Sequence, residues 1–162
     1  MSLATFDAAG GAALRQVRLA TTFVGFNLAL VAVDGPRGHL FVYSNASGMN
    51  MVDTRTGAVL ASGPSDYLPL RGAVAERSGQ VFVANLNFGA QGGRPGQAQG
   101  SLSAFDAATG VGRHLSYIGY SPTGLVADET TGRLFVTTAG TLADNDQSAI
   151  AGTVLVYDLK AL

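Results

Sequence analysis

Short apolar runs rich in Val, Leu, Phe and Tyr, each bounded by Gly or Asp, recur along the whole chain. This composition is typical of β-strands. Three of the runs, LFVYS (40–44), VFVAN (81–85) and LFVTT (134–138), are apolar on both faces rather than alternating with polar residues. Such runs predict strands buried on both sides between stacked sheets. No helical periodicity of useful length interrupts them, so the pattern predicts an all-β fold.

Two short phrases alternate along the chain and make it an internal repeat. The first is an apolar run that ends in Asp and is followed by a turn, and its acidic residues are Asp7, Asp53, Asp106 and Asp158. The second places Phe three residues after Gly, at Phe41, Phe82 and Phe135. From each Asp to the next Phe the count is 34, 29 and 29 residues, but from each Phe to the next Asp it is 12, 24 and 23. The length from Asp to Phe is therefore nearly constant, whereas the length from Phe to Asp doubles after the first repeat.

The turns between Asp and Phe have a chemical rationale. Residues 53–57 read Asp-Thr-Arg-Thr-Gly, which supplies a carboxylate to cap a turn and a Gly for a positive φ angle. Residues 128–132 have the same plan. Both predict tight hairpin turns of about three to five residues.

One unit read in this way contains four antiparallel strands. We expect them at 124–127, 133–137 and 153–158, with the fourth strand represented by 113–118 of the preceding unit. Four strands per roughly 40–50 residues are typical of a blade of a β-propeller. The whole chain then holds thirteen strands in groups of two, four, four and three.

The segments TGLVADETTGRLFVTT (123–138) and SLSAFDAATG (101–110) match a known repeat most closely. They resemble the YVTN-type repeat of YncE-like and quinoprotein amine dehydrogenase β-chain-like propellers. The resemblance implies one partial propeller domain over 1–162, made of two strands in 1–20, blades in 28–62 and 71–118, and an incomplete blade in 124–162. It carries no catalytic motif, because the repeated residues are those of strands and turns.

About three blades are too few for a closed ring, which typically has roughly four to eight. Three explanations stay open: a fragment of a larger propeller, a half-ring that a second copy completes to about six blades, or an open array. An open ring exposes an apolar blade face at each end. We therefore expect the isolated polypeptide not to be a stable monomer. Its expected partners are further blades of the same propeller or a second copy of the chain.

The expanded connections, 84–100 and 137–152, are expected on one face of the array, and the tight turns on the other. Long connections often carry function. The candidate ligand-binding residues of this face are Asn85, Asn87, Arg94, Tyr67, Arg71 and Tyr120. Amide side chains both donate and accept hydrogen bonds, Arg94 is the only charge in its connection, and Tyr and Arg are enriched at binding hot spots. Alternatively, the asparagines satisfy turn backbone, Arg94 is solvated, and the others pack around the central channel.

Composition narrows the choice of function. The net charge of −1 leaves no electrostatic footprint for nucleic acid, and the absence of Cys removes disulfides and thiolate chemistry. No segment has the length of a membrane span or the pattern of a signal peptide. The chain as written is expected in the cytoplasm, or in the periplasm or outside the cell if it belongs to a longer protein.

No catalytic constellation stands out. His39 and His114 have no partner at metal-ligand spacing, and 144–146 (Asp-Asn-Asp) lacks the closing Glu of a calcium loop. No metal or cofactor is expected. The sequence thus predicts a scaffold that binds a peptide, polysaccharide or small ligand through its long-connection face. The alternative is part of a propeller enzyme, a lactonase-like hydrolase or quinoprotein-dehydrogenase-like subunit, whose remaining blades lie outside this chain.

Overall fold

The computed structural model describes residues 2–6, 9–18, 28–44, 48–64, 68–87, 99–139 and 151–162. These residues form β-strands and turns, and none of them is helical. Thirteen strands in the described residues group into antiparallel sheets of two, four, four and three strands. The all-β prediction and the expected grouping of strands are therefore confirmed. Among the described residues, no helix is long and apolar enough to cross a membrane.

The sheets are named here by their order in the chain. The first sheet contains β1 (Ser2–Phe6) and β2 (Ala13–Arg18). The second contains β3 (Leu28–Asp34), β4 (His39–Ser44), β5 (Gly48–Asp53) and β6 (Val59–Gly63). The third contains β7 (Leu68–Ala75), β8 (Gln80–Asn87), β9 (Gln99–Asp106) and β10 (Gly112–Tyr120). The fourth contains β11 (Pro122–Asp128), β12 (Arg133–Thr138) and β13 (Thr153–Asp158).

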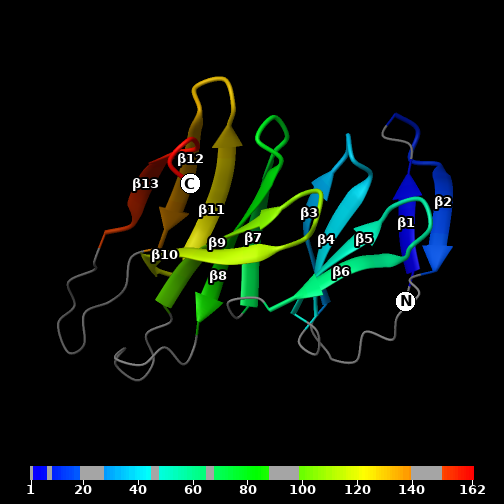
Figure 1. The fold of residues 1–162 in the computed structure, drawn as a ribbon, viewed down its shortest axis with the longest axis horizontal. Helices are drawn as coiled ribbons and strands as arrows, with labels where there is room; N and C mark the ends of the chain where they lie inside the picture. The colour runs from blue at the N-terminus through cyan, green and yellow to red at the C-terminus, as the bar shows by residue number, and fades with distance from the viewer. Residues whose placement is uncertain are drawn as a thin grey trace.

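Each sheet is a meander in which strands follow one another in chain order. The four sheets stand side by side in chain order, from the first sheet (blue) to the fourth (orange and red), with the chain ends at opposite sides (Figure 1). Among the leading strands of the last three sheets, β7 adjoins both β3 and β11. Buried residues of the inner strands β4, β8 and β12 also pack between neighbouring sheets, so the faces of the sheets meet there.

Two apolar clusters fill the spaces between successive sheets. The cluster between the second and third sheets joins Phe41 and Met51 to Val83 and Phe105. The cluster between the third and fourth sheets joins Phe82 and Leu102 to Leu134 and Val136, among others. Each cluster belongs to one pair of neighbouring sheets, so the core is divided into layers.

The second strand of each larger sheet supplies residues to both of its faces. All four residues from Val81 to Ala84 in β8 are fully buried, and Leu40 to Val42 in β4 are nearly so. The expectation of burial on both faces is confirmed for these two strands. It is wrong for β12, where Leu134 and Val136 are fully buried but Phe135 is only half-buried. The physical reason is that no sheet in the described residues covers that face of β12.

The tight turns have the geometry that the sequence predicts. The Asp106 Oδ1 atom accepts hydrogen bonds from the backbone N–H of Thr109 at 2.7 Å and from its hydroxyl at 2.8 Å. Gly110 then closes the turn with a φ of 73°, in the left-handed region that favours glycine. The hydroxyl of Thr109, followed by its backbone N–H, holds the pKa of Asp106 below the ordinary value of 3.8.

The backbones of β3 and β7 approach each other closely at Gly72. A Cβ atom placed on Gly72 would lie 2.1 Å from the carbonyl oxygen of Val31 and 2.8 Å from its carbonyl carbon. The φ angle of Gly72 is outside the left-handed region, so this glycine is required by space rather than by its dihedral angles. The contact brings the second and third sheets together at their leading strands.

Candidate functional site

Antiparallel pairing gives the stack two different edges. The turns 34–38, 53–57, 76–79, 106–110 and 128–132 share one edge, which we call the short-turn edge. The ends of β4, β8 and β12 and the starts of β5, β9 and β13 share the other, which we call the long-connection edge. The division into two edges agrees with the sequence prediction, although residues 88–98 and 140–150 lie outside the described residues.

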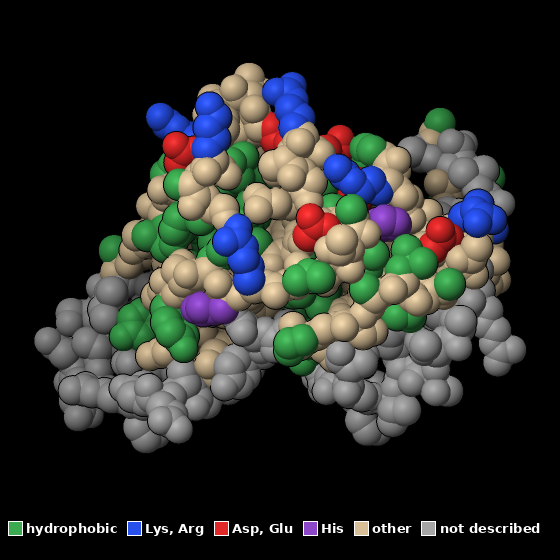
Figure 2. Space-filling model, in the orientation of Figure 1, with side chains coloured by type: hydrophobic (Ala, Val, Ile, Leu, Met, Phe, Trp, Pro, Cys, Tyr) green, Lys and Arg blue, Asp and Glu red, His purple; other side chains and the backbone are tan. Residues whose placement is uncertain are grey.

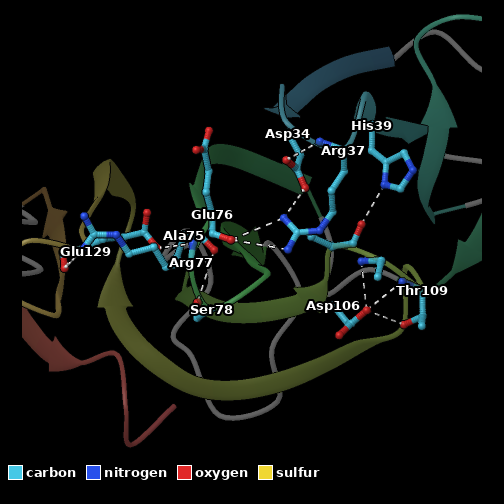
Figure 3. Close-up of polar contacts among 12 residues, drawn as sticks. Asp34, Arg37, His39, Ala75, Glu76, Arg77, Ser78, Asp106, Thr109 and Glu129 are labelled. Atoms are coloured by element: carbon cyan, nitrogen blue, oxygen red, sulfur yellow. Dashed lines mark hydrogen bonds and ion pairs between the residues drawn. The ribbon is translucent and has the colours of Figure 1, made fainter.

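Charged side chains on the short-turn edge join neighbouring sheets (Figure 3). Arg37 forms an ion pair of 3.0 Å with the fully buried Asp34, and its guanidinium lies 3.5 Å from the carbonyl oxygen of Glu76 in the third sheet. The backbone N–H of Arg77 donates to a carboxylate oxygen of Glu129 in the fourth sheet at 2.6 Å. These groups are engaged in holding the stack together.

His39 also has a structural contact, because its Nδ1 atom lies 2.8 Å from the carbonyl oxygen of Ala107 in the third sheet. In the space-filling view, most of the visible Lys, Arg, Asp and Glu side chains lie toward the upper edge, over these turns (Figure 2). The charged groups thus gather where they link sheets. A ligand site is better sought at the opposite edge.

A cavity of about 370 Å³ lies on the long-connection edge, between the end of β10 and the start of β13. Its lining includes three tyrosine rings and two threonine hydroxyls, from Tyr117, Tyr120, Tyr157, Thr138 and Thr153. None of the described residues that line it is charged. The cavity is therefore suited to a neutral ligand that offers apolar or aromatic surface and hydrogen-bonding groups.

The aromatic residues of the cavity differ in how firmly they are held. Tyr157 lies in β13, packs against the core, and places its hydroxyl 3.4 Å from that of Ser116. Tyr117 is 66% exposed, and the centroid of its ring lies 5.1 Å from that of His114, with the two ring planes tilted by 57°. The site therefore has one fixed aromatic ring and one that is available to a ligand.

β13 forms one side of the cavity and is an edge strand. Within the described residues it pairs with β12 alone, whereas the third strands of the second and third sheets pair on both sides. The outward backbone groups of an edge strand are free to accept another strand. The cavity thus combines aromatic surface with an open strand edge.

Another cavity, of about 430 Å³, lies at the opposite end of β12 and β13. Its lining includes Arg133, Asp158 and Lys160, together with Val156. It is larger, but its lining residues lie at the short-turn end of β12 and β13 rather than on the long-connection edge. We therefore place the candidate ligand site in the smaller cavity.

The sequence-predicted site residues are distributed over several places. Tyr120 is half-buried at the end of β10 and lines the cavity. Arg71 is exposed on β7, where its Nε donates to the carbonyl oxygen of Thr123 at 2.9 Å and so joins β7 to β11. Tyr67 and Arg94 lie outside the described residues.

Asn85 and Asn87 belong to the expected connection 84–100, but the structure places both in a strand. Both lie within β8, and they are 0% and 3% exposed. The Nδ2 of Asn85 donates to the hydroxyl of Ser103 on β9 at 3.0 Å. This hydrogen bond satisfies the buried amide nitrogen, so β8 can extend past Asn85. In the described part of the chain the Oδ1 of Asn85 has no hydrogen-bond partner. Their role in ligand binding stays a prediction.

Sequence reasoning missed Tyr117 and Tyr157. Tyr157 immediately precedes Asp158 in the repeated phrase, at the place that Phe105 holds before Asp106, so the residue was assigned to the scaffold. A signal near Tyr117 was Gly119, which has a φ of 85° and lies where the pairing of β10 with β9 is irregular. A glycine within a strand commonly marks such a bulge.

No protein-family model matches the chain, and a search of curated proteins finds none that is similar. In the part of the chain that the structure describes, no group of three or more His, Asp or Glu side chains is placed to hold a metal ion. The geometry of the chain itself therefore carries the inference of function.

Proposed function

We propose that the chain is a β-propeller repeat module that acts as a binding scaffold through its long-connection edge. The four-stranded meanders support this proposal, because a propeller blade has the same up-and-down order of strands. The adjoining leading strands β3, β7 and β11 also support it, because such strands line the central axis of a propeller. In this interpretation each sheet is a blade or part of one.

The ligand that best fits the site is an extended peptide. The observation that carries this proposal is the neutral, aromatic cavity beside the open edge of β13. An extended peptide forms backbone hydrogen bonds with a free strand edge, while neighbouring pockets receive alternate side chains. Tyr117 and Tyr157 line such a pocket next to β13.

The test is selection of displayed random peptides on the full chain, followed by calorimetric titration of a selected peptide. We expect Tyr117→Ala to weaken binding by about tenfold or more, as aromatic hot spots do. Tyr117→Phe keeps the ring and should retain most of the affinity. Val111→Ala is the matched control, because Val111 is 70% exposed in the turn between β9 and β10, on the other edge.

Equal peptide affinity in the wild type and Tyr117→Ala would contradict the peptide site. Selection of no peptide, together with binding of a polysaccharide that depends on Tyr117, would replace the peptide by a saccharide. The alternative of a propeller enzyme stays a prediction from the sequence, because no contact among the described residues specifically favours it.

A further inference from the structure

The fourth sheet has an apolar face that no other sheet covers in the described residues. Its members occupy alternate positions of the three strands, and they are Val126, Phe135, Val154 and Val156. The three valines are 59%, 61% and 52% exposed, and Phe135 is half-buried. Val126, Phe135 and Val156 lie side by side in one row across the sheet. We call these four residues the outer face of the fourth sheet.

The same repeat positions are covered in the preceding sheets, where all but the partly buried Ala73 are buried. In the third sheet they are Ala73, Phe82, Leu102 and Ala104, which pack in the cluster shared with the fourth sheet. In the second sheet they are Ala32, Phe41, Met49 and Met51, which pack in the cluster shared with the third sheet. Phe82 and Phe41 are both fully buried. The side chains at these positions are thus covered by the third sheet in one case and by the fourth sheet in the other.

The opposite end of the stack has a residue that matches this face. Phe6 is 60% exposed and precedes Asp7, as Phe105 precedes Asp106. Phe105 is the residue that meets the preceding sheet, since its ring lies 6.5 Å from that of Phe41. Tyr157, in the same repeat position of the fourth sheet, packs against the cluster that contains Phe82.

The orientation of the first sheet leaves Phe6 available. The side chain of Arg15 donates to the carbonyl oxygen of Arg55 in the second sheet, so the Arg15 face of the first sheet is turned toward the second. In the register of the first sheet, Arg15 lies opposite Thr5. The pairing of β1 with β2 shifts register between Thr5 and Phe6, so alternation along β1 does not fix the direction of Phe6. The repeat does, because the equivalent residue Phe105 meets the sheet before its own, and no described sheet precedes the first. We therefore infer that Phe6 points away from the stack.

We propose that the outer face of the fourth sheet docks onto the first sheet of a second copy of this chain. Phe135 of one copy then meets Phe6 of the other, in the arrangement that Phe41 and Phe105 adopt within one copy. This contact joins two different surfaces, so it is head-to-tail and forms either a closed ring or an open filament. The inference goes beyond the proposed peptide site and does not depend on it.

The first test measures the mass of the full chain in solution by light scattering. We expect a mass of two or more copies for the wild type and a shift to the mass of one copy for Phe135→Asp. Val111→Asp is the matched control and should keep the wild-type mass, because Val111 is equally apolar and 70% exposed but lies in a turn. Far-ultraviolet circular dichroism checks that each variant retains its strands. A wild type with the mass of one copy would overturn the proposal, and so would an unchanged mass for Phe135→Asp.

The second test determines which surfaces meet, and it exploits the absence of Cys from the chain. A copy with Phe6→Cys and a differently tagged copy with Phe135→Cys are mixed and treated with a short bismaleimide. We expect cross-links between the two kinds of copy to exceed those within either kind. Cross-links mainly between Phe135→Cys copies would show that two fourth sheets meet. A lack of cross-links would show that the outer face of the fourth sheet does not contact a second copy and would favour other parts of a longer protein as its partner. Either result would overturn the proposal.

Discussion

Replacement of Gly72 by Ala is expected to separate the second and third sheets at their leading strands. The added Cβ would lie 2.1 Å from the Val31 carbonyl oxygen, 2.8 Å from its carbonyl carbon and 2.9 Å from its Cγ1. Real Cβ contacts are essentially never shorter than 3.0 Å. Two of the three atoms belong to the backbone of a paired strand, so rotation of a side chain cannot relieve the overlap. We expect a loss of about 2–3 kcal/mol in the free energy of unfolding, at the upper end of overpacking effects.

Thermal unfolding followed by circular dichroism measures this effect. For a chain of this length the expected loss corresponds to a decrease in Tm of about 5–10 °C. Gly63→Ala is the matched control, because a Cβ on Gly63 meets nothing within 4 Å and its φ is outside the left-handed region. That control should be neutral or slightly stabilising, since Ala restricts the unfolded chain more than Gly does. If Gly72→Ala and Gly63→Ala melt at the same temperature, the close approach of β3 and β7 has been misjudged.

Two further predictions concern the short-turn edge. The lowered pKa of Asp106 means that its carboxylate stabilises the fold above the ordinary value of 3.8, and that this contribution is lost as pH falls through the lower folded-state pKa. Thr109→Val removes the main hydrogen-bond donor and should raise this pKa toward 3.8, whereas an unchanged carboxyl titration by NMR would contradict the assignment. Arg37→Ala should lower the free energy of unfolding by about 2–4 kcal/mol in urea titrations, because it leaves the buried Asp34 carboxylate without its ion pair. The double variant Asp34→Ala, Arg37→Ala should recover much of the loss, since the third sheet holds the buried Ala75 at the equivalent position; no recovery would show that Arg37 acts through other contacts.

The strands and their grouping could be predicted because the signals are local and repeated. An Asp, a Thr and a Gly determine the turns 53–57, 106–110 and 128–132 through hydrogen bonds within a few residues, as at Asp106, Thr109 and Gly110. The buried strands between turns are apolar without interruption. The end of β8 was less predictable, because the hydrogen bond between Asn85 and Ser103 lets a polar residue continue a buried strand.

The candidate site could be predicted only in part. Tyr120 was identified from its residue type and its position on the long-connection edge. Tyr117 and Tyr157 come from different sheets, and their proximity depends on how the third and fourth sheets stack, which periodicity does not determine. For the same reason, the sequence of β12 could not show that Phe135 lies on an uncovered face, because the pattern is identical where a neighbouring sheet is present.

The division of the core into separate layers has a consequence for cooperativity. Each of the two larger apolar clusters couples one pair of neighbouring sheets, so the stability of the array is close to a sum of nearest-neighbour terms, as in repeat proteins. The third sheet contributes to both clusters, whereas none of the first-sheet side chains that the structure describes belongs to either. Fraying therefore costs least at the ends of the array and most at its middle. A partner that covers a terminal sheet therefore reduces fraying there and makes the unfolding of the whole chain more cooperative.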